Sequence, residues 1–229
     1  PAVLGSVLFL LIIAIFGISR LTVSGNFTDD LPKNHEIFTD IHWFEKEFGG
    51  MIPVEISIDT KKPKRVEHYT FLKKLKEFND SLVSNPYLSK GVSVNNAIMF
   101  AKQAYYNGAE DKYSPMTSSE RLFLAPYLKV NEEGATGSSM KGYVNEDKSI
   151  ARVSYLMADL SLIDMEQLMK EINTQLDIVF DPEKYNTSIT GSSIVFLKGT
   201  RFLTYNLVQS ILLAIIVISV LMAFLFPEP

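Results

Sequence analysis

The sequence predicts a membrane protein of the α+β class, in which two hydrophobic helices flank one water-facing domain. Residues 2–19 are 18 consecutive residues without a charge, and residues 207–226 are 20 more. At about 1.5 Å per residue, each run is long enough to cross the roughly 30 Å hydrocarbon core of a bilayer. Residues 7–18 and 211–225 are apolar on every face apart from Gly17 and Ser219, whereas a core helix of a soluble protein normally carries a polar stripe. We therefore expect transmembrane helices at 2–19 and 207–226, and one folded domain at 20–206.

A cleaved signal peptide is the alternative interpretation of the first run. No Lys or Arg precedes this run, and the residues that follow it, Ile18 to Leu21, do not form a small-residue cleavage site. We therefore favour a transmembrane helix. The chain begins at Pro1 without Met and stops directly after the second run, so we expect it to be part of a longer protein.

The charge balance of the domain argues against nucleic acid as a partner. Residues 20–206 hold 22 Lys and Arg against 25 Asp and Glu, a net charge of −3. The densest basic stretch, Lys61 to Arg65, is interpreted as a solvated turn before a helix. Cysteine is absent, so neither disulfides nor thiolate metal sites are available.

The first part of the domain alternates between helical and strand periodicity. An amphipathic helix is expected over 36–48, because Ile37, Ile41, Phe44 and Phe48 share a face and Gly49 follows. A half-buried strand is then expected at 52–58, with every second residue apolar. A helix over 66–83 and a short strand at 92–94 come next.

The second part begins with a largely helical insertion at about 95–131, whose start signal is the capping-box sequence Thr117 to Glu120. Strands at 140–144 and 149–157 are expected to form a hairpin, followed by a helix capped by Ser161 and a last strand at 187–190. The order strand, helix, strand, strand, helix, strand predicts a ferredoxin-like (split βαβ) antiparallel sheet. We expect the inward residues of its first strand to face the apolar stripes of its two helices.

One hypothesis for several aromatic and Met residues of the domain is that they form a path for lipid-like substrates. The candidate path residues are Phe27, Trp43, Phe44, Met51 and Met99. Aromatic rings and flexible thioethers adapt well to acyl chains. The alternative is that Trp43 is an anchor at the membrane interface and that the others belong to the core.

The sequence offers no catalytic constellation. It lacks the Gly-x-Ser-x-Gly spacing of a nucleophile elbow and the Gly-Lys-Ser/Thr ending of a phosphate loop. His35 and His42 lie seven residues apart on the 36–48 helix, but a zinc site needs three or four converging ligands. Asp29 and Asp30 are interpreted as a solvated exit loop. We expect no enzyme activity, no metal and no cofactor.

The order of features resembles the resistance-nodulation-division (RND) superfamily, in particular its hydrophobe-exporting branch with the MMPL-type transporters. The resemblance rests on Phe27 to Pro32 after the first run, Glu45 to Gly50 at the helix end, and Pro53 to Ile58 in the strand. It continues with Ile189 to Ser192, which lead into a long helix and the second run.

The resemblance implies a fragment of a proton-driven exporter of hydrophobic or amphiphilic molecules. Residues 20–206 would be a periplasmic or extracellular porter domain on a multi-pass protein of the inner (cytoplasmic) membrane. Its partners would be the lipid bilayer, an amphiphilic small molecule, the remaining transmembrane helices and a second porter domain. Proton-relay residues would lie in other spans, because 2–19 and 207–226 contain no ionisable residue.

Two alternatives share the topology of two runs around one domain. A two-span receptor with an extracytoplasmic ligand-sensing domain would require a signalling module after residue 226. A membrane-anchored enzyme lacks catalytic residues.

Overall fold

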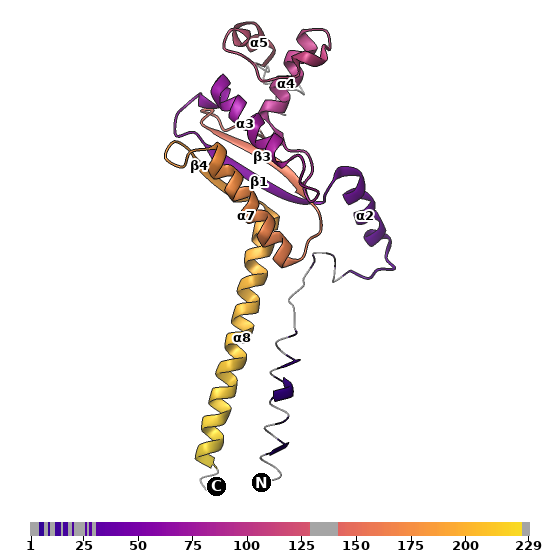
Figure 1. Cartoon of the computed structure of the whole chain (residues 1–229), viewed down its shortest axis with the longest axis vertical. Coiled ribbons are helices and arrows are strands. Elements are labelled where there is room, and N and C mark those ends of the chain that lie inside the picture. The colour runs from indigo at the N-terminus through magenta and orange to yellow at the C-terminus, as the bar shows by residue number, and fades with distance from the viewer. Residues whose placement is uncertain are drawn as a thin grey trace.

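The computed structural model describes residues 31–128 and 142–225, together with residues 5, 6, 9, 12–14, 16, 17, 20, 26 and 28. These residues form a mixed α+β domain with a four-stranded antiparallel sheet, from which one long apolar helix extends (Figure 1). The strands are β1 (Ile52–Asp59), β2 (Val92–Ser93), β3 (Ile150–Met157) and β4 (Asn186–Thr190). Their order in the sheet is β2-β3-β1-β4, so β2 lies at one edge and β4 lies at the other.

The core lies between the sheet and two helices, α3 (Tyr69–Leu82) and α7 (Leu162–Val179). Alternate residues of β1 are buried, as the period-2 pattern predicts. The predicted inward face is confirmed, because these strand residues share one apolar cluster with the predicted helix residues. The cluster includes Val54, Ile56, Ile58, Leu72, Leu75, Met165, Leu168 and Ile172.

Two aromatic residues add to this core beyond the predicted stripe. Phe71 and Phe180 are fully buried, and the rings of Phe71, Phe78 and Tyr185 pack around Phe180 at centroid distances of 5.3–6.0 Å. Tyr69, the first residue of α3, is exposed. The helix begins there, after a 3₁₀ turn at Arg65–Glu67, so its first residue extends past the edge of the core.

The predicted helical insertion contains α4 (Val94–Tyr105), a 3₁₀ turn at Glu110–Lys112 and α5 (Glu120–Leu128). It lies at the end of the domain opposite to the membrane-type helix (Figure 1). The capping box is confirmed: the Thr117 N–H donates to Glu120 Oε2 at 2.9 Å, and the Glu120 N–H donates to Thr117 Oγ1 at 3.4 Å. The strand predicted at 92–94 ends at Ser93, because the Ser93 N–H and hydroxyl both donate to Asn96 Oδ1 and α4 starts at Val94.

The predicted hairpin strand at 140–144 is reduced to a single bridge between Val144 and Ala151. Residues 140 and 141 lie outside the described residues, and Gly142 and Tyr143 form a turn. The turn that follows is fixed by Asn145, whose Oδ1 accepts from the N–H groups of Ser149 and Ile150. Lys148 has a positive φ of 58°, which closes the turn back onto β3.

The long helix α8 (Ser192–Leu225) covers residues 207–225 of the predicted second span, and residue 226 lies outside the described residues. Among the residues that the structure describes, Ser192–Met222 is the one helix long and apolar enough to cross a membrane, and its most apolar stretch is fully exposed. The described residues of the predicted first span, such as Gly5, Ala14 and Gly17, are helical. Most of 2–19 lies outside the described residues.

Candidate amphiphile-binding surface

An aromatic cluster lies on helix α2 (Glu36–Phe48), which precedes β1. The rings of Phe44 and Phe48 stack at 4.4 Å between centroids with an interplanar angle of 25°. Trp43 meets Phe48 edge-on at 6.4 Å. Exposed fractions of 60% for Trp43, 40% for Phe44 and 52% for Phe48 show that the domain does not cover these rings. We call Trp43, Phe44 and Phe48 the α2 aromatic cluster.

The local sequence explains why this helix forms at the predicted bounds. His35 is the N-cap, and its Nδ1 accepts from the Ile37 N–H at 3.3 Å. Glu36 in the first turn and Lys46 in the last turn match the helix dipole. Gly49 ends the helix in the left-handed conformation, with φ of 73°. The helix is therefore stable locally, although none of its thirteen residues, all described, is buried.

Two contacts place α2 beside the sheet. Gly50 passes so close to β3 that a Cβ atom there would lie 2.6 Å from the carbonyl carbon of Leu156. The Met51 N–H then donates to the Met157 carbonyl at 2.9 Å and starts the pairing of β1 with β3. The Glu45 side chain makes the second contact, because its Oε1 accepts from the Asp159 N–H at 2.7 Å.

The candidate path residues that the structure describes lie in different parts of the domain. Trp43 and Phe44 belong to the α2 aromatic cluster, and Met51 is half-buried where the chain leaves α2 and packs against the core. Met99 is buried, at 5% exposed, on α4, in a different part of the domain. Phe27 lies outside the described residues. Phe48 was missing from the predicted path, although its i, i+4 spacing from Phe44 indicates the stacking.

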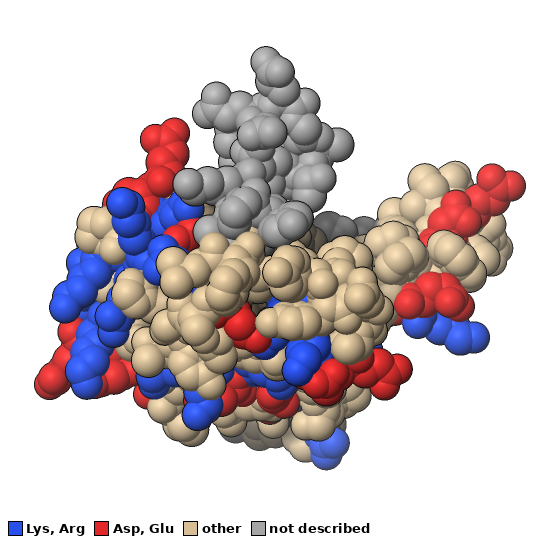
Figure 2. Space-filling view, turned by 90° about the horizontal axis from the view of Figure 1, so that it is seen from above, with Lys and Arg blue, Asp and Glu red and all other residues tan. Residues whose placement is uncertain are grey.

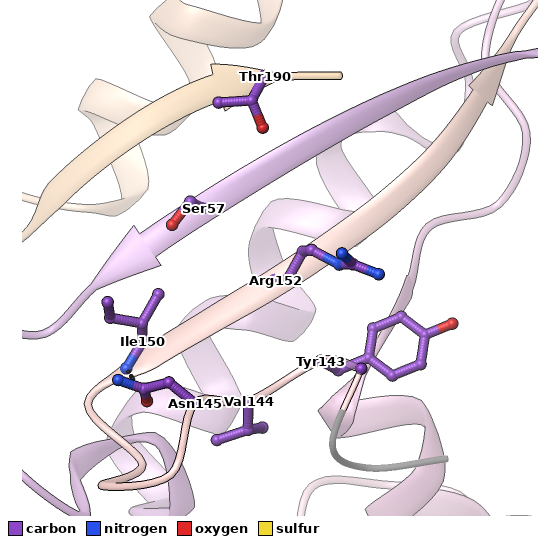
Figure 3. Close-up of a pocket in the computed structure, with 8 residues that line it drawn as sticks. Ser57, Tyr143, Val144, Asn145, Ile150, Arg152 and Thr190 are labelled. Atoms are coloured by element: carbon purple, nitrogen blue, oxygen red, sulfur yellow. Dashed lines mark hydrogen bonds between the residues drawn. The ribbon is translucent and has the colours of Figure 1, made fainter. Parts of the chain in front are cut away.

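A second surface is the open face of the sheet, which carries a shallow hollow of about 240 Å³. Ser57, Ile150, Arg152 and Thr190 line it from the strands, and Tyr143, Val144 and Asn145 border it (Figure 3). Arg152 Nε lies 3.2 Å from Glu55 Oε2, and the guanidinium group lies 5.9 Å from the Tyr143 ring centroid. Because Glu55 balances the charge of Arg152, this face is polar without a strong field.

Charged side chains of both signs intermingle on the face of the domain seen from above in Figure 2. Within the described residues no three His, Asp or Glu side chains gather at a point that would hold a metal ion. His35 caps α2, and His42 Nδ1 lies 3.3 Å from Glu45 Oε2. His35 and His42 therefore both take part in local contacts of α2. Asp29 and Asp30 lie outside the described residues.

No family model matches the chain. It is similar to the G-2 subunit of eukaryotic translation initiation factor 3 from Drosophila ananassae, with 28% identity over 116 residues. The matched part is 51% of this chain, and it spans 40% of the length of that protein. A similarity this low and this short does not place the chain in the family of that protein.

Proposed function

We propose that this chain is the porter part of a proton-driven RND-type exporter of hydrophobic or amphiphilic molecules. The observation that carries the proposal is the direct continuation of an antiparallel α+β domain into α8, a 34-residue helix with exposed apolar side chains. Such a helix is stable in lipid, where its backbone groups are satisfied internally and its apolar surface needs no protein cover. The domain is thereby held at a membrane surface, where amphiphiles gather.

The topology supports a ferredoxin-like porter domain. The elements β1, α3, β2, β3, α7 and β4 follow one another in the order of the split βαβ motif, with α4 and α5 inserted between β2 and β3. Each strand pair in the order β2-β3-β1-β4 is antiparallel.

The α2 aromatic cluster supports contact with an amphiphile. Three exposed aromatic rings on one short helix form an apolar surface of the kind that marks an interaction site. Phe44 and Phe48 already stack, so an acyl chain would meet a preformed surface with little further ordering. In this proposal the role of the chain is binding alone, without enzyme activity or cofactor.

The remaining parts of the transporter would complete the function. Further transmembrane helices and a second porter domain would supply the proton relay and the alternating movement. Residues 207–226 contain no ionisable side chain, so a relay requires other spans. In this proposal the domain lies on the periplasmic or extracellular side of the inner membrane.

Two rival functions are weaker. A two-span receptor shares the topology, but nothing in the domain favours a sensor over a porter. The name of the similar Drosophila protein suggests a role in translation initiation. Such a role does not explain the exposed apolar side chains of α8.

Transport by the full-length protein tests the proposal. The protein is reconstituted in proteoliposomes with a fluorescent lysophospholipid and a proton gradient. We expect gradient-dependent movement of the lipid, which is lost when the gradient is collapsed. Lipid movement that does not depend on the gradient, or the absence of lipid movement, would contradict an exporter. Absence of lipid movement together with a ligand-induced signal across the membrane would favour the receptor.

A further inference from the structure

We propose that Glu45 and Asp159 form a latch that holds α2 against the domain, and that α2 swings about Gly49 and Gly50 when the latch opens. The latch is a structural claim that stands apart from the proposed function. One part of it rests on the proposed function, namely that Glu45 is a positioning residue for the α2 aromatic cluster.

The first step is the way in which α2 is held. No residue of α2 is fully buried, and every residue of this helix is described. Its apolar contacts are limited to partly buried side chains such as Phe38 and Ile41. The side-chain contact described between α2 and the domain is polar: Glu45 Oε1 accepts from the Asp159 N–H at 2.7 Å. His42 holds the other carboxylate oxygen, with 3.3 Å between Nδ1 and Oε2. A charge-assisted hydrogen bond is strong, but it is one bond at one point along the helix.

Asp159 joins three segments of the chain. Its backbone N–H bonds to α2, and its Oδ2 accepts from both the N–H and the hydroxyl of Thr28. Thr28 is buried and lies in the segment that leads from the N-terminal hydrophobic run to α2. Asp159 itself belongs to the connection between β3 and α7. One polar node therefore ties the segment near Thr28, the helix α2 and the central sheet together.

The second step is the pivot. Gly49 is in the left-handed conformation and Gly50 has a φ of 151°, two conformations that side chains disfavour. From Met51 onward the chain is fixed in the sheet by its bond to Met157. The two glycines thus separate a rigid strand from a rigid helix. Rigid elements joined by small residues that tolerate unusual dihedral angles are the usual construction of a hinge.

The C-terminal connection to α8 is built in the opposite way. The Ser193 hydroxyl donates to the Pro53 carbonyl at 3.0 Å, Leu197 is buried in the core, and Arg201 pairs with Glu166 at 3.1 Å. Several contacts of different kinds fix the start of α8 to β1 and α7. A movement of the domain relative to the membrane would thus be carried by α8, while α2 is free to respond when the latch opens.

Spin labels measure the swing directly, because the natural chain has no cysteine. The full chain in nanodiscs carries Thr39→Cys on α2 and Lys170→Cys on α7, both at exposed positions. A reference pair, Lys170→Cys with Ser188→Cys, reports on the core alone. Thr39 lies about 15 Å along the helix from Gly49, so a moderate swing changes its distance to α7 by roughly 10 Å.

The expected result is a narrow distance distribution between 39 and 170 that broadens and shifts with Glu45→Ala. Glu45→Gln keeps an oxygen acceptor for the Asp159 N–H and should restore the narrow distribution. Asp159→Ala releases Thr28 but keeps the backbone N–H that Glu45 accepts from, so it should leave the 39–170 distribution narrow. Glu47→Ala is the matched control on the same helix, where the side chain is exposed.

The proposal is overturned if Glu45→Ala leaves the 39–170 distribution unchanged, or if it broadens the reference pair equally, since the core itself would then depend on Glu45. The positioning role has its own readout, which is quenching of Trp43 by a brominated lysophospholipid. We expect Glu45→Ala to weaken this binding severalfold and Glu45→Gln to retain it. Absence of quenching in the natural chain would count against the proposed function, while the distance measurement would still decide the latch.

Discussion

Lys102 of α4 and Glu120 of α5 form an ion pair inside the helical insertion, with 3.0 Å between Nζ and Oε2. The Lys102 side chain is only 5% exposed, and it also donates to the Ser114 hydroxyl at 3.0 Å. Glu120 is at the same time the carboxylate of the capping box with Thr117. The Lys102–Glu120 pair thus links the contact between α4 and α5 to the capping box at the start of α5.

Removing the cation should loosen the insertion. Lys102→Met leaves the Glu120 carboxylate without its partner, and breaking a buried pair on one side costs about 3–5 kcal/mol, reduced here because Glu120 is partly exposed. We expect a loss of about 2–3 kcal/mol in the free energy of opening α4 and α5, measured by hydrogen exchange. The double variant Lys102→Met, Glu120→Gln should recover most of this loss. A single variant as stable as the natural chain would contradict the role of the pair.

The pH dependence of the insertion follows from Glu120. Burial raises the pKa of this carboxyl, but hydrogen bonds from the Thr117 N–H, from Lys102 and from the Thr117 hydroxyl outweigh it, so the pKa is lowered from 4.5. The stabilisation is therefore complete above the unfolded pKa and is lost as the pH falls through the lower, folded pKa. The free energy of opening α5, obtained from hydrogen exchange after correction for the pH dependence of the intrinsic exchange rate, should stay nearly constant between pH 5 and 7, because this range lies above the ordinary carboxyl pKa. Faster opening on approaching pH 7 would contradict this sign.

The open and closed faces of β1 should respond differently to truncation. Ile56→Ala removes a fully buried side chain and should cost about 2–5 kcal/mol in the free energy of unfolding. Ser57→Ala, the next residue on the open face, should change stability by less than about 0.5 kcal/mol. Urea unfolding in detergent, followed by circular dichroism, measures both. Equal effects would mean that the core does not lie on the helix-covered face.

Gly191, just before α8, and Gly199, within α8, should respond in opposite ways to substitution by Ala. Gly191 has a φ of 106°, and a Cβ there would lie 2.8 Å from the Pro53 carbonyl oxygen, so Gly191→Ala should destabilise the junction by about 1–3 kcal/mol. Gly199 lies within α8 with open space around it, so Gly199→Ala should stabilise the helix by about 0.5–1 kcal/mol. Thermal unfolding of the two variants should therefore shift in opposite directions. A shift of the same sign in both would contradict the tight junction.

The periodic parts of the fold were predictable from sequence, because local pattern and tertiary packing agree there. The bounds of α2 and the inward face of β1 follow from spacing and capping residues alone. The short strand β2 was less predictable, since Ser93 can continue a strand or cap a helix and Asn96 decides between them. Of the predicted hairpin partner of β3, the described residues 142–144 make one bridge to β3, and the next residue, Asn145, binds the backbone of the turn.

The candidate site was predictable only in part. Trp43 and Phe44 are marked by their place on an amphipathic helix, and the structure shows that the domain leaves them exposed. Met99 could not be separated from them by residue type, because a Met on a helix fits a core as well as a surface. The contact between Glu45 and Asp159 joins residues 114 positions apart, and no local pattern indicates it.

Trp43 provides the most direct test of the claim that α2 takes an amphiphile, because it is the single tryptophan of the chain. The full chain in nanodiscs is titrated with a brominated lysophospholipid, whose bromine quenches indole fluorescence on contact. A control protein with Trp43→Phe and Tyr205→Trp reports the lipid that merely enters the bilayer. We predict saturable quenching of Trp43, weakened by Phe44→Ala and Phe48→Ala but not by Phe100→Ala, while the control follows lipid content without saturation. Quenching of Trp43 that is absent, or that parallels the control at every concentration, would contradict amphiphile binding by α2.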